Sequence, residues 1–200
     1  MSTQDLAATA RALAAPGKGI LAADESSGTI EKRFDSIHVE STEENRRAYR
    51  ELLFTTDGMG EFISGVILYD ETLRQRSVDG TPFAEVLSAQ GIIPGIKVDN
   101  GAKPLAGFDG EKITEGLDGL RDRLAEYYEL GARFTKWRAV IAIGDGIPTA
   151  GCIDANAEAR HWSVERNEAG GIIDIHDPPI RCGTSALAAK ATIEEVRQRN

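Results

Sequence analysis

The sequence predicts an α/β fold in which helices cover parallel strands, and three observations support this prediction. Apolar runs typical of strands alternate with amphipathic runs typical of helices along the chain. The strand runs are apolar on both faces, as in strands that are covered from both sides. Charged residues lie within or at the carboxyl ends of several strands, namely Asp24, Lys97, Lys136 and Arg138. Such charges favour a barrel, because an open doubly wound sheet more often carries its polar groups in loops.

Apolar periodicity and turn residues give the bounds of the expected elements. Strands are predicted at residues 19–23, 63–69, 92–98, 132–143 and 171–176. Helices are predicted at residues 3–14, from 41 onward, and at 81–91, 117–131, 154–168 and 184–199. Ser41 and Glu44 form a predicted capping box for the second helix, which places Tyr49, Leu52 and Leu53 on one face. Glycines and a proline within residues 101–115 predict a loop or a small hairpin.

The expected strand at residues 132–143 is unusual because two cations interrupt an apolar run. Lys136 and Arg138 are two residues apart, so they share one face of the strand. Two cations inside a sheet are costly unless an anionic group meets them. The sequence therefore predicts a site that binds an anionic substrate, and the alternative is an edge strand with solvated charges.

Composition limits the classes of function that the chain can serve. A length of 200 residues suits a single domain over residues 1–200, and the net charge of −9 argues against a dedicated nucleic-acid or anionic-membrane surface. No apolar run reaches the length of a membrane span, and the first residues do not resemble a signal peptide. Cys152 and Cys182 lack metal-ligand spacing, which indicates free thiols in a reducing, cytoplasmic setting. The three histidines also lack ligand spacing, so no metal is expected.

Six segments carry a family resemblance, and they occur in the family's order at residues 21–26, 42–47, 65–68, 95–99, 116–120 and 134–138. Together they resemble the class I fructose-bisphosphate aldolases over about residues 10–159, whereas residues 160–200 diverge from the family pattern. The resemblance implies a (β/α)8 TIM-barrel type of fold. About five of the eight strands are present, so the barrel is expected to be incomplete. Ile20, Val66 and Ile96 are expected to face its interior without partners from the other strands.

The resemblance also implies roles for individual residues. Asp24, Lys97 and Lys136 match catalytic positions of the family, with Asp24 hydrogen-bonding the substrate and positioning the catalytic amine. Residues that match substrate-binding positions are Ser26, Thr29, Lys32, Arg33 and Arg138. Ser26 has a second interpretation as a helix N-cap, and Arg33 as a solvated charge. No metal and no organic cofactor is implied, because a lysine amine supplies the electron sink as a Schiff base.

The chain departs from the family at two catalytic positions. His176 lies nearest the position of a catalytic glutamate, and no segment matches the setting of the Schiff-base lysine. The expected function is that of a class I aldolase of glycolysis, which cleaves fructose 1,6-bisphosphate to dihydroxyacetone phosphate and glyceraldehyde 3-phosphate, in a truncated form that lacks this lysine. The alternative is a non-catalytic aldolase-like fragment that binds sugar phosphate or self-associates into a homo-oligomer. Another Schiff-base lyase, such as a transaldolase, is a weaker third hypothesis.

Overall fold

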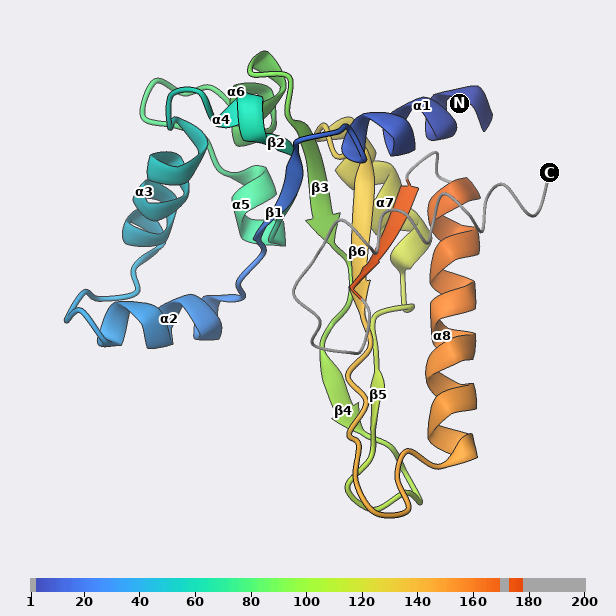
Figure 1. Cartoon of the computed structure of the whole chain (residues 1–200). Coiled ribbons are helices and arrows are strands. Elements are labelled where there is room, and N and C mark those ends of the chain that lie inside the picture. Colours follow the sequence, from blue (N-terminus) through green and yellow to red (C-terminus); the bar gives the residue numbers. More distant parts are fainter. Residues whose placement is uncertain (1–2, 170–172, 178–200) are drawn as a thin grey trace.

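The computed structural model describes residues 3–169 and 173–177, in which helices and strands alternate (Figure 1). The helices are α1 (Thr3–Leu13), α2 (Ser27–Asp35), α3 (Glu43–Phe54), α4 (Met59–Phe62), α5 (Asp70–Arg74), α6 (Phe83–Ala89), α7 (Leu120–Glu129) and α8 (Ala150–Ala169). The strands are β1 (Gly19–Ala23), β2 (Ile63–Leu68), β3 (Ile93–Lys97), β4 (Ala102–Pro104), β5 (Lys112–Thr114), β6 (Phe134–Arg138) and β7 (Ile173–Asp177).

Five parallel strands form the main sheet in the order β1-β2-β3-β6-β7. The sheet curls and carries helices on its outer side, so the prediction of an incomplete (β/α) barrel is confirmed. The remaining strands, β4 and β5, pair antiparallel as a hairpin. Of the two alternatives predicted for residues 101–115, a loop or a small hairpin, the structure shows the hairpin. In Figure 1 this hairpin extends beyond the carboxyl ends of β3 and β6.

The outer face of the sheet packs against the helices and forms the larger part of the core. Val66 and Ile96 lie on this face with no exposed surface, in one cluster with Leu87, Leu124 and Trp137. The expectation that Val66 and Ile96 face the barrel interior is therefore wrong. Parallel strands are apolar on both faces, so an alternating pattern that would identify the inner face is absent from the sequence.

The inner face of the sheet carries a smaller apolar cluster near the amino ends of the strands. The ring of Phe134 is fully buried there beside Leu13 of α1 and the partly buried Ile20. Gly95 leaves room for this ring, since a Cβ atom on Gly95 would lie 2.3 Å from the Phe134 Cζ atom. Further along the same face, Lys97 pairs in register with Lys136. The apolar cluster thus supports a charged layer at the carboxyl ends.

Strand β6 is shorter than the predicted strand at residues 132–143. It ends at Arg138, where its ladder with β7 also ends, whereas its pairing with β3 ends at Lys136. Val140 is 38% exposed and Ile143 is 77% exposed. Residues 139–143 have the composition of a strand, but they pair with no strand among residues 3–169 and 173–177, and pairing decides where a strand ends.

Three predicted helix boundaries also shift. Thr42, rather than Ser41, caps α3, because its Oγ1 atom accepts a hydrogen bond of 3.1 Å from the Asn45 backbone N–H. Leu52 of this helix is 70% exposed, so it does not belong to the buried face. Helix α8 begins four residues before the predicted start at residue 154, and α7 begins three residues after the predicted start at residue 117.

Some of the remaining sequence predictions fall on described residues and others do not. The predicted helix at residues 184–199 and Cys182 lie outside them. Cys152 is free and buried. No helix among residues 3–169 is long and apolar enough to cross a membrane.

Candidate functional site

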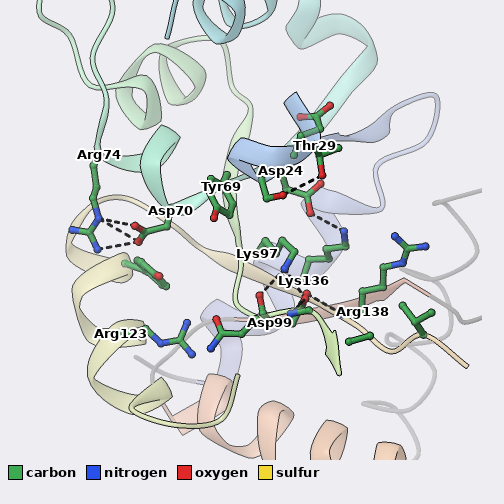
Figure 2. Close-up of a pocket in the computed structure, with 17 residues that line it drawn as sticks. Asp24, Thr29, Tyr69, Asp70, Arg74, Lys97, Asp99, Arg123, Lys136 and Arg138 are labelled. Carbon is green, nitrogen blue, oxygen red and sulfur yellow. Dashed lines mark hydrogen bonds and ion pairs between the residues drawn. The ribbon is translucent and has the colours of Figure 1, made fainter. Parts of the chain in front are cut away.

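A pocket of about 860 Å³ opens at the carboxyl ends of the strands (Figure 2). Its charged lining comes from the ends of β1, β3 and β6 and from the helices α5 and α7. The charged residues of the lining are Asp24, Glu25, Asp70, Arg74, Lys97, Asp99, Arg123, Lys136 and Arg138. The carboxyl ends of parallel strands meet at one edge of a sheet, which brings together side chains that are far apart in the sequence.

Lys136 and Asp24 form the most buried ion pair of the pocket. The Lys136 Nζ atom donates a hydrogen bond of 2.7 Å to Asp24 Oδ2, and both residues are less than 10% exposed. The strand containing Lys136, β6, lies between β3 and β7 inside the sheet, whereas Asp24 directly follows β1 at the edge of the sheet. Their contact crosses the curled inner face, so the predicted anionic partner for the inward cation is part of the protein itself.

Lys97 and Asp99, which are two residues apart in the sequence, form the second ion pair. The Lys97 Nζ atom donates to Asp99 Oδ1 at 2.5 Å and to the Asp99 carbonyl oxygen at 2.6 Å. Figure 2 shows the two lysines between Asp24 and Asp99. The Lys97 side chain is 19% exposed, so its ammonium group lies at the surface of the pocket and within reach of a ligand.

Arg138 supplies the third cation at the end of β6. Its side chain is exposed at the pocket, and its backbone is held from two sides. The Thr114 hydroxyl donates a hydrogen bond of 2.8 Å to the Arg138 carbonyl oxygen, and the Arg138 backbone N–H donates to Asp99 Oδ2 at 3.3 Å. The hairpin that contains Thr114 therefore braces the strand end that carries this guanidinium group.

The predicted substrate-binding residues of the first loop divide into two groups. Ser26 and Thr29 line the pocket, with their hydroxyl oxygens 3.1 Å apart. Ser26 occupies the N-cap position of α2, but its side chain caps no backbone N–H. Lys32 and Arg33 are exposed and do not line the pocket.

The pocket has no arrangement that would hold a metal ion within the described part of the chain. No group of three or more His, Cys, Asp or Glu side chains comes together there in a way that could bind one. His176 lies in β7 in register with Trp137. The ammonium groups of Lys97 and Lys136 and the guanidinium group of Arg138 line this pocket, and such groups can bind an anionic ligand.

Comparison with known proteins identifies the family to which this pocket belongs. The family model of class I fructose-bisphosphate aldolase, a glycolytic enzyme, matches residues 5–196. The chain belongs to this family. The match extends beyond residues 10–159, where the quoted motifs lie.

Similar aldolases come from bacteria, plants and protozoa. A probable class 1 aldolase from Xanthomonas axonopodis pv. citri is 59% identical over 90% of this chain and 54% of its own length. A cytosolic aldolase from Arabidopsis thaliana is 54% identical over 88% of this chain and 49% of its own. The structure of the Plasmodium falciparum aldolase, in complex with TRAP and an inhibitor, has a TM-score of 0.84 at 48% identity, covering 86% of this chain and 50% of that one. This chain thus spans about half the length of the aldolases that it matches.

An ion pair beside the pocket was not predicted from the sequence. Arg50 of α3 is 2% exposed, and its guanidinium group contacts the carboxylate of Glu25, which also receives a hydrogen bond from Arg33. Burial by itself would raise the pKa of Glu25, but hydrogen bonding and the charge of Arg50 hold that pKa below its usual value. The position of Glu25 next to Asp24 at a strand end was the available signal, whereas nothing local marks Arg50 as buried.

A second unpredicted group lies at the wall of the pocket that α5 and α7 form. Arg74 contacts both Asp70 and Glu126 and so joins α5 to α7. Burial would raise the pKa of Asp70, but hydrogen bonds from Arg74 and Tyr127 hold it below its usual value. Asp70 directly follows the second strand after Tyr69, so the rule that identified Asp24 could also have identified this residue.

The Glu25→Gln variant should lose stability at neutral pH, because Arg50 would then be buried without a carboxylate. We expect a loss of about 2 kcal/mol in the free energy of unfolding. A lowered pKa in the folded state contributes stability above the unfolded pKa, which is about 4.3 for glutamate, and this stability is lost as the pH falls through the folded value. The difference between variant and wild type should therefore shrink at acid pH in urea unfolding experiments.

A matched control separates this effect from a general response to acid. Glu44 pairs with Arg47 on the surface of α3, and its side chain is 70% exposed. Exposed ion pairs contribute little, so Glu44→Gln should cost less than Glu25→Gln at pH 7. An equal loss in both variants, or a Glu25→Gln effect that does not change with pH, would contradict the role given to the buried pair.

Proposed function

We propose that the pocket binds a sugar bisphosphate and that the protein serves the class I aldolase reaction. In this reaction fructose 1,6-bisphosphate is cleaved to dihydroxyacetone phosphate and glyceraldehyde 3-phosphate. The observation that carries the proposal is the meeting of Lys97, Lys136 and Arg138 in one pocket at the strand ends. The names of the similar aldolases support the same substrate and a place in glycolysis.

The three cations suit different parts of such a substrate. The planar guanidinium group of Arg138 can bind two oxygens of one phosphate, and the ammonium group of Lys97 can bind a second anionic group. Lys136 is held by Asp24 on the buried side of the pocket, where a carbonyl or hydroxyl group of the sugar would lie. We therefore assign Asp24, Lys97 and Lys136 to the reaction centre, and Ser26, Thr29 and Arg138 to substrate binding. Lys32 and Arg33 are exposed outside the pocket lining, and their assignment to substrate binding comes from the family resemblance.

The class I reaction requires a neutral lysine amine that attacks the ketose carbonyl. Loss of water gives an iminium ion, which accepts the electron pair when the carbon–carbon bond breaks. Lys97 and Lys136 each donate to a carboxylate, so we assign them to binding and orientation rather than to this attack. The proposal includes a single domain over residues 1–200, with residues 160–200 diverging from the family, a cytoplasmic location, no nucleic-acid or membrane partner, and association into a homo-oligomer. It requires no metal and no organic cofactor.

Titration with fructose 1,6-bisphosphate tests the proposal. In isothermal calorimetry, Arg138→Ala should weaken binding by about tenfold or more, since a charge-assisted hydrogen bond contributes roughly 1.5–3 kcal/mol. Fructose, which lacks phosphates, should bind far more weakly than the bisphosphate. Arg121→Ala is the matched control, because Arg121 is an exposed arginine of α7 outside the pocket. Equal affinity in Arg138→Ala and wild type would remove Arg138 from the site.

A further inference from the structure

Asp99 stands out among the pocket residues because its carboxylate faces neighbouring protein groups rather than the open pocket. Its side chain is 3% exposed, and a buried carboxylate is costly unless it is paired and hydrogen-bonded. Asp99 Oδ1 accepts from the Lys97 ammonium at 2.5 Å and from the Gly101 backbone N–H at 3.0 Å. Asp99 Oδ2 accepts from the Arg138 backbone N–H at 3.3 Å. Both oxygens are therefore engaged within the protein.

These contacts connect two of the three pocket cations to one residue. Asp99 holds Lys97 through the ammonium group itself, because its carboxylate and its carbonyl oxygen take two of the three donors. It contacts Arg138 through the backbone N–H, whereas the Thr114 hydroxyl contacts the Arg138 carbonyl oxygen. The third cation, Lys136, has a separate partner in Asp24. The distance between the Lys97 and Arg138 anchor points thus depends on Asp99.

We propose that Asp99 is a positioning residue that fixes the spacing between Lys97 and Arg138, and so selects ligands with two anionic groups. This inference rests on the proposed function, because it concerns the same pocket. A ligand with two phosphates needs two cations at a set separation. A single phosphate needs only one cation, so it still binds when the spacing between the two cations changes. A cation that is misplaced loses its charge-assisted hydrogen bond to the ligand, which lowers affinity by about tenfold or more. Asp99 itself offers the ligand no donor.

Two ligands measured on the Asp99→Asn variant separate an effect of positioning from an effect of charge. Asparagine keeps an oxygen that can accept from Lys97 or Gly101, but it loses the negative charge and presents an amide donor toward the Arg138 N–H. Fructose 1,6-bisphosphate should bind about tenfold more weakly or worse. Inorganic phosphate should bind as well as before or more tightly, because one negative charge leaves the pocket. Calorimetry measures both affinities, and thermal melting reports whether the variant is folded.

Three further variants complete the design. Asp109→Asn makes the same charge change at an exposed position of the β4–β5 loop and should alter neither affinity. In a Lys97→Met background, Asp99→Asn should cost less bisphosphate affinity than in the wild type, since residues that act as a unit are not additive. Where Asp99→Asn does not fold, Asp99→Glu, which keeps the charge but moves it by one methylene, is judged by the same two affinities.

The outcomes distinguish this inference from the proposed function. If Asp99→Asn lowers the affinity for fructose 1,6-bisphosphate but not for inorganic phosphate, the result supports the positioning role of Asp99. Equal losses for both ligands in a folded variant, or no loss for either, would overturn it while the proposed function stands. A wild-type chain that binds no fructose 1,6-bisphosphate would overturn both.

Discussion

Replacing Lys136 by methionine should destabilise the protein and abolish sugar bisphosphate binding. The substitution leaves Asp24, which is 9% exposed, without the ammonium group at 2.7 Å. Removing one partner of a buried ion pair typically costs about 3–5 kcal/mol, because the other charge stays buried and uncompensated. Asp24 borders the pocket, so water can reach part of the carboxylate, and we expect the lower end of this range. Urea unfolding and calorimetry measure the two effects.

A double variant shows whether Lys136 acts through charge or only through packing. Replacing both partners, as Lys136→Met with Asp24→Leu, removes both charges and should recover most of the lost stability. Binding of fructose 1,6-bisphosphate should not recover, since both groups are assigned to the reaction centre. Lys103→Met, at an exposed position of β4, controls for the substitution type. Full stability in Lys136→Met, or restored binding in the double variant, would contradict these roles.

Gly95→Ala should be among the most destabilising single-methyl additions in the chain. A Cβ atom there would lie 2.3–2.5 Å from three ring atoms of Phe134, a separation that atoms do not adopt. The ring is fully buried between the sheet and α1, so it cannot move aside without displacing Leu13. Overpacking of this kind costs about 1–3 kcal/mol and occasionally more. We expect about 3 kcal/mol by urea unfolding.

The control for this substitution is Gly28→Ala in α2. A Cβ atom on Gly28 would meet nothing within 4 Å, so alanine should raise stability by about 0.5 kcal/mol through the unfolded state. Shrinking the ring partner, as Phe134→Leu in the Gly95→Ala background, should recover part of the loss. A Gly95→Ala variant as stable as the wild type would show that Phe134 does not pack over Gly95.

The sequence predicts the order of the five main strands well, but it does not predict the helices α2, α4 and α5 or the faces and ends of the strands. Glycines, prolines and apolar periods mark where each of the five main strands lies. The end of β6 at Arg138 depends on the lengths of β3 and β7, which no local pattern reports. The same holds for Val66 and Ile96, which face the helices and not the barrel interior. Apolar residues on both faces of a parallel strand leave this orientation open.

The candidate site also contains residues that the sequence predicts and residues that it does not. Lys97, Lys136 and Asp24 could be predicted to meet, because charges at the carboxyl ends of parallel strands converge on one edge of the sheet. Arg50 could not, since it lies on a helix and reaches Glu25 across 25 residues of sequence. Its burial follows from the way α3 packs beside the first loop. Contacts that depend on helix packing are thus the part of the site that required the structure.

The most direct test of the account is a crystal structure of the chain with fructose 1,6-bisphosphate. We expect the ligand in the pocket at the strand ends, with one phosphate within hydrogen-bonding distance of the Arg138 guanidinium group and another anionic oxygen within reach of the Lys97 ammonium group. The sugar should lie against Lys136 and Asp24. A ligand bound elsewhere on the molecule, or bound in the pocket without contact to any of Lys97, Lys136 and Arg138, would contradict it.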